Sequence, residues 1–132
     1  MITDTELVMS DAQAVTVTAP STSYIDQKAA GDPGKPCYLV IRVDTSFTAT
    51  GSGTLTIDLE TDDNTAFSSA TILWSSGAVG KASLVGSSVG YRKIIPIPIG
   101  AERYLRINYT VATGPMTAGN IDAFITKGPE IA

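Results

Sequence analysis

Four acidic residues stand close together near the middle of the chain: Asp58, Glu60, Asp62 and Asp63, with Asn64 directly after them. Oxygen ligands of this kind suit calcium, and two carboxylates a few ångströms apart could act as the acid and base of a glycosidase. The offsets and the glycine of an EF-hand loop are absent, however, and turns favour Asp and Asn for their own reasons. We therefore interpret these residues as a solvated acidic strand face that runs into a turn, and we expect no metal or cofactor.

Nucleophilic chemistry has no recognisable base in this chain. The sequence contains no histidine, so neither a Ser-His nor a Cys-His pair can form. The single cysteine, Cys37, begins an apolar segment and is predicted to be a small buried side chain. Lys81 and Ser83 lie close together but lack the Ser-x-x-Lys order of a serine acyltransferase. We predict that the protein is not an enzyme.

Charge and composition exclude several classes of partner. The 132 residues carry a net charge of −4, and 43% of them are hydrophobic, which predicts one folded domain rather than a disordered chain. An acidic balance disfavours nucleic acid and anionic membranes as partners. The opening residues 1–6 are acidic rather than basic, which disfavours a secretory signal.

The elements that position these residues are predicted to be strands throughout. Apolar and polar residues alternate with period two, most regularly over 55–62 and 103–111, and no helical periodicity is present. Weaker strand signals cover 15–18, 23–26, 38–43, 71–76, 91–99 and 121–126. Gly, Asp, Asn and Pro punctuate the chain as predicted turns at 31–34, 51–53, 62–64, 77–80, 86–90 and 113–115. The pattern predicts an all-β fold: an antiparallel, jelly-roll-like β-sandwich of seven or eight short strands with an extended N-terminal arm.

The first 36 residues differ in character from the rest. Residues 1–36 are predicted to form the arm, with one or two short strands and a Gly/Pro loop, and residues 37–132 the main sandwich of the same domain. Leu7, Val8 and Met9 form an isolated apolar cluster in this polar arm. Either the cluster is a first strand packed on its own sandwich, or it docks on a neighbouring subunit.

Two further segments are candidates for a subunit interface. Pro96 and Pro98 remove backbone donors from one side of their strand, which predicts a sheet edge that is either protected from aggregation or shaped for a partner. In segment 103–111 the apolar residues predict one inward face, so Tyr104 and Arg106 should point outward. Tyr and Arg concentrate binding energy at protein interfaces.

The chain as a whole resembles the cement, or decoration, proteins of tailed-bacteriophage heads. The resemblance is collective and involves no chemical motif. It is carried by residues 7–16, 21–26, 38–40, 62–67, 95–98, 103–109 and 113–119.

This resemblance implies a jelly-roll fold, no catalytic residues and a homo-oligomer, with a dimer favoured. It implies that the protein is made in the cytoplasm of a bacterial host. There it would attach to the outside of a capsid and bind neighbouring copies of the major capsid protein. The alternative is a carbohydrate-binding or adhesion β-sandwich, for which an exposed aromatic platform would be the distinguishing feature.

Overall fold

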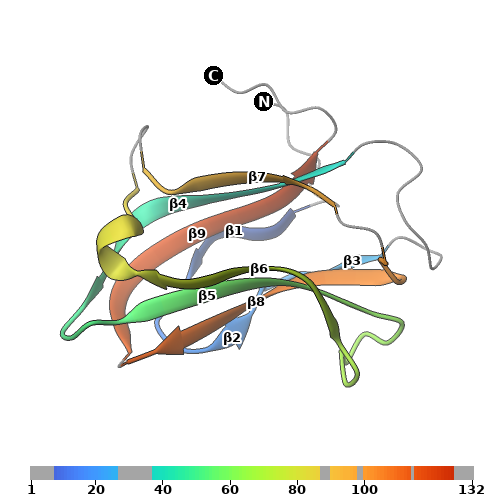
Figure 1. Cartoon of the computed structure of the whole chain (residues 1–132), viewed down its shortest axis with the longest axis horizontal. Helices are drawn as coiled ribbons and strands as arrows, with labels where there is room; N and C mark the ends of the chain where they lie inside the picture. Colours follow the sequence, from blue (N-terminus) through green and yellow to red (C-terminus); the bar gives the residue numbers. More distant parts are fainter. Residues whose placement is uncertain (1–7, 27–36, 87–89, 98–99, 114, 127–132) are drawn as a thin grey trace.

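The computed structural model describes residues 8–26, 37–86, 90–97, 100–113 and 115–126. These residues form two antiparallel sheets that stack face to face, which confirms the predicted all-β sandwich (Figure 1). Nine strands are present in the described residues, along with one short 3-10 helix, η2 (Lys81–Ser83). The strands are β1 (Val8–Ala14), β2 (Ala19–Pro20), β3 (Ile25–Asp26), β4 (Tyr38–Ala49), β5 (Thr54–Asp62), β6 (Thr71–Gly80), β7 (Arg92–Pro96), β8 (Tyr104–Ala112) and β9 (Met116–Thr126).

Each sheet combines strands from both halves of the chain. The four-stranded sheet has the order β1-β9-β4-β7. The five-stranded sheet has the order β2-β8-β5-β6, and β3 also pairs with β8. The N-terminal strands therefore complete both sheets beside C-terminal strands, as Figure 1 shows for β1 and β2.

Alternation along β5 and β8 produces the core as the sequence predicts. The inward residues of both strands are buried, and they pair across the sheet, with Ile57 opposite Tyr109 and Leu59 opposite Ile107. Their partners across the sandwich come mainly from β4 and β9, including Leu39, Ile41 and Ile121. Burial of this apolar surface supplies most of the stabilisation of the fold.

Two local predictions are wrong. Residues 15–18 are not a strand but the connection between β1 and β2, because Val15 turns its side chain into the core as the chain crosses between the sheets. Residues 77–80 are not a turn: they lie inside β6, where Gly77 has a φ of 68° beside a register shift in the β5–β6 pairing. A glycine in a strand marks such bulges as readily as it marks turns.

The apolar cluster of the N-terminal segment belongs in part to the sandwich itself. Met9 is completely buried in the core, and β1 pairs with β9. This placement matches a first strand packed on its own sandwich and leaves Met9 no surface for a partner. Val8 is half-buried at the start of β1, and Leu7 lies outside the described residues.

A buried polar contact fixes β1 against the opposite sheet. The Ser10 hydroxyl lies 2.8 Å from the Tyr109 hydroxyl and donates to Gln13 Oε1 at 2.7 Å. Gln13 Oε1 also accepts from the backbone N–H of Thr22, so the contact extends to the chain between β2 and β3. Burial raises the pKa of Tyr109, because the surrounding core cannot solvate a phenolate.

We expect Tyr109→Phe to destabilise the protein by about 1 kcal/mol, the usual cost of one lost buried hydrogen bond. Because the raised pKa favours the neutral phenol in the folded state, the contribution of Tyr109 to stability is complete below about pH 10 and is lost as the pH rises further. Urea unfolding between pH 7 and pH 11 measures both effects. A variant that loses stability above pH 10 as steeply as wild type would contradict this assignment to Tyr109.

No helix among the described residues is long and apolar enough to cross a membrane.

Candidate protein-interaction surface

The outer face of the five-stranded sheet carries the residues that the sequence predicts to point outward. Tyr104 and Arg106 are partly exposed on β8, whereas Leu105 and Ile107 between and beside them are buried. The register places Arg106 opposite Glu60 on β5 and Tyr104 opposite Asp62. The predicted assignment of faces on β8 is therefore confirmed.

Three aromatic rings, those of Tyr24, Phe67 and Tyr104, gather on this face. Tyr24, 48% exposed, meets the Tyr104 ring edge-to-face at 5.5 Å between centroids, with an angle of 82°. The Tyr24 ring also meets Phe67 at 6.4 Å and 63°. Phe67 comes from the turn after β5, where its φ of 51° and the bond from its N–H to the Asn64 carbonyl shape the chain. Segments far apart in the sequence thus build one aromatic cluster.

Two arginines hold the cluster to neighbouring strands. Arg106 donates from Nε to Glu60 Oε1 at 2.8 Å, and its guanidinium lies 4.4 Å from the centre of the Phe67 ring. Arg103 makes a two-bond contact with Asp26 at 2.9 and 3.2 Å and lies 5.0 Å from the Tyr104 ring centre. The hydrogen bonds to Asp26 raise the pKa of Arg103. We call Tyr24, Phe67, Arg103, Tyr104 and Arg106 the aromatic–arginine surface.

The acidic residues of β5 share this face, but the prediction of a solvated acidic stripe is wrong. Asp58 is 8% exposed and Asp62 only 2%, while Glu60 is paired with Arg106. Cross-strand neighbours on β8 flank the stripe, and the turn that carries Phe67 folds back onto its Asp62 end. The period-two pattern identifies the face of these acids correctly but cannot show that the turn folds back onto Asp62.

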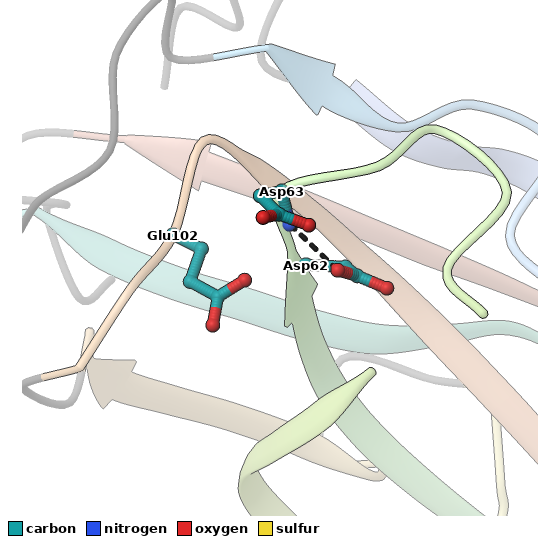
Figure 2. A group of neighbouring side chains, drawn as sticks. All are labelled: Asp62, Asp63 and Glu102. Carbon is teal, nitrogen blue, oxygen red and sulfur yellow. Dashed lines mark hydrogen bonds between the residues drawn. The ribbon is translucent and has the colours of Figure 1, made fainter. Parts of the chain in front are cut away.

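Asp62 serves the turn that follows β5 (Figure 2). Its Oδ1 accepts the N–H of Asp63 at 2.7 Å, and its Oδ2 accepts the N–H of Ser69 at 2.9 Å. The bond from Ser69 is the main reason that the pKa of Asp62 lies below its ordinary value. One carboxylate thereby ties the two ends of the turn together.

Asp62→Asn should lower the thermal midpoint by a few degrees at neutral pH, because a neutral amide with a single acceptor oxygen cannot replace both bonds. The lowered pKa of Asp62 stabilises the fold fully above about pH 4, and this contribution disappears as the pH falls and the carboxyl is protonated. The difference between wild type and variant should therefore shrink between pH 5 and pH 2. Thermal unfolding by circular dichroism measures it, and a constant difference across this range would contradict the role of the charge.

Asp63 and Glu102 approach Asp62 at the same end of the sheet. One carboxylate oxygen from each residue lies within 4.8 Å of the others, a group that Figure 2 shows to be shared by the end of β5 and the segment before β8. Both oxygens of Asp62 already accept backbone N–H groups. These two bonds explain the position of the Asp62 carboxylate.

The remaining predicted interface residues lie at sheet edges. Pro96 is exposed on β7, which pairs only with β4 among the described residues and so confirms the predicted edge; Pro98 lies outside those residues. The other edge strands are also irregular or short, which hinders pairing with a further strand. β1 has register shifts, and β6 has a bulge at Gly77. β2 is only two residues long and ends in Pro20. The edges of both sheets are therefore poorly suited to pairing with a further strand.

Sequence reasoning missed Tyr24, Phe67 and Arg103 as members of this surface. Tyr24 precedes a strand of two residues, and Phe67 occupies a turn, so neither residue has a periodic pattern from which its face could be predicted. Arg103 precedes β8 by one residue and belongs to the surface through its pairing with Asp26 on β3.

The fold and this surface define a small antiparallel β-sandwich with an aromatic–arginine surface on one outer face. The model of the Bbp16 family matches residues 9–125, so the chain belongs to the Bbp16 family. No curated protein matches the chain.

Proposed function

We propose that this protein is a structural component of a phage virion that binds the outside of the capsid and cements neighbouring major capsid subunits. The similarity of the sequence to head decoration proteins suggests this role, and the acidic, histidine-free composition agrees with a part that performs no catalysis. The protein would act as a homo-oligomer, most simply a dimer, on the surface of the virion.

The observation that carries the proposal is the aromatic–arginine surface. Its tyrosines and arginines are the residue types that contribute most to protein interfaces. Tyr104 and Arg106 stand on β8, and Tyr24 and Arg103 lie directly beside strands. All four are held by ion pairs or ring contacts, so little side-chain freedom remains to be lost on binding. Many copies, each with one modest contact of this kind, would together resist the expansion of a filled shell.

The ring geometry favours a protein partner over a sugar. A carbohydrate platform offers ring faces side by side, whereas Tyr24 stands edge-to-face to both Tyr104 and Phe67. The Arg103 and Arg106 guanidinium groups lie against the Tyr104 and Phe67 rings. These contacts leave less of each ring free for stacking, which is why we place the carbohydrate-binding alternative second.

Co-sedimentation with assembled phage heads tests the proposal. Purified protein should pellet with heads that lack it, saturate at a fixed ratio to the major capsid protein, and raise the temperature at which the heads release their DNA. Protein that remains in the supernatant at every ratio would refute the proposal. Binding to a glycan array with no binding to heads would support the adhesion alternative instead.

A further inference from the structure

A buried acidic side chain at the centre of the same outer face has no hydrogen-bond partner among the described residues. Asp58 is 8% exposed, and its Oδ1 is enclosed yet makes no hydrogen bond with any described residue. The register places Ser75 of β6 on one side of Asp58 and Asn108 of β8 on the other. The side-chain contact that Asn108 does make is with Thr110, at 3.5 Å.

The other buried acids among the described residues have partners. Asp62 accepts two backbone N–H groups, and Asp122 accepts from Arg42 and from the backbone of Ala12. Glu60, two residues from Asp58 on the same face, is paired with Arg106. A buried carboxylate without a partner destabilises a fold, so its presence beside an interaction surface points to a partner supplied from outside the chain.

The charge of the surroundings identifies the chemistry of that partner. Among the described residues, six carboxylates but only two guanidinium groups lie on this face or at its end: Asp26, Asp58, Glu60, Asp62, Asp63, Glu102, Arg103 and Arg106. The whole sequence has 13 acidic and nine basic residues, which leaves seven of each for the rest of the chain. The net charge of −4 is therefore concentrated at this face, which would attract a basic protein surface and repel a phosphate backbone.

We infer that the outer face of the five-stranded sheet docks on a basic protein surface that places a lysine or arginine side chain on Asp58, between Ser75 and Asn108. This inference rests on the proposed function, in which the partner surface belongs to the capsid. Lysine and arginine fit the position because a long apolar stem can pass over the sheet while the charged end reaches the carboxylate. Asp58 is then a specificity determinant that only the bound state satisfies.

The test is Asp58→Asn in the full chain, which keeps the shape of the side chain and removes its charge. We expect an unchanged or raised thermal midpoint, because an unpaired buried charge is lost. Affinity for phage heads should fall at least tenfold, and it should depend less steeply on sodium chloride concentration. Addition of EDTA should leave wild-type binding unchanged, since the cation belongs to the partner protein.

The control is Asp44→Asn, which makes the same change at an exposed residue of β4 in the other sheet and should alter neither quantity. Wild-type binding to heads with equal binding by Asp58→Asn would overturn this inference alone. A midpoint several degrees lower would also overturn it, since Asp58 would then have a structural partner in the chain. Loss of wild-type binding in EDTA would show a metal ion instead, and failure of wild type to bind heads would overturn both proposals.

Discussion

Gly119→Ala should destabilise the protein by about 3 kcal/mol or more. Gly119 lies in β9 with a φ of 144°, a backbone angle that residues other than glycine rarely adopt. A Cβ at this position would stand 2.4 Å from Cγ of Phe47, whose ring is buried in the core between the sheets. Backbone strain and overpacking therefore add, because the Phe47 ring is itself packed among other core side chains.

Urea unfolding measures this loss, and Gly80→Ala provides the matched control. A Cβ at Gly80 meets no atom within 4 Å, and its φ of −68° is an ordinary one. The control should change the free energy of unfolding by less than about 1 kcal/mol. Equal stability of the two variants would show that β9 can shift away from Phe47 and that the core is less tightly packed than the structure indicates.

The double replacement Tyr104→Ser with Arg106→Ser should weaken binding to phage heads, or association between subunits, by about 100-fold or more. Interface tyrosines and arginines each contribute about 1 to 4 kcal/mol when they are centrally buried, and about 2.7 kcal/mol corresponds to a factor of 100. The protein should stay folded, because Leu105 and Ile107 of the same strand, rather than the replaced residues, contact the core. Sedimentation of the variant alone and with heads measures both kinds of association.

The opposite sheet offers an equivalent pair as a control. Tyr38 and Arg42 point outward from β4. Arg42 pairs with Asp122 and lies 5.9 Å from the Phe124 ring centre. Arg106 makes the same two kinds of contact on the other sheet, with Glu60 and Phe67. Tyr38→Ser with Arg42→Ser should leave association nearly unchanged. Loss of association in this control alone would move the interface to the four-stranded sheet. Unchanged association in both double variants would show that neither of these two sheet faces forms the interface.

Sequence patterns predicted the sheets better than they predicted what covers them. The alternation in β5 and β8 placed Leu59 and Ile107 in the core and Arg106 outside, because one buried face imposes period two on a strand. Alternation did not predict a strand that begins at Val8, because the bulges of β1 interrupt the period-two pattern. Only the three-dimensional structure shows that Met9 is buried.

The candidate surface was predictable only where regular strands build it. Tyr104 and Arg106 followed from strand periodicity, whereas Tyr24 and Phe67 reach the surface through irregular segments whose direction depends on tertiary contacts. The missing partner of Asp58 could not be predicted either. Its lack of a hydrogen bond depends on where Asn108 and Ser75 lie across the sheet, and single-chain periodicity contains no such information.

The order of strands in the four-stranded sheet also determines when the chain can fold during its synthesis. β9 (Met116–Thr126) lies between β1 and β4, so neither of those earlier strands has its full set of neighbours until the ribosome has made almost the whole chain. Contacts between residues so distant in sequence make folding slow, and the apolar faces of β1 and β4 stay exposed in the meantime. Nascent chains that end before Met116 should therefore be sensitive to proteases along their whole length. Folding should begin only after β9 leaves the exit tunnel.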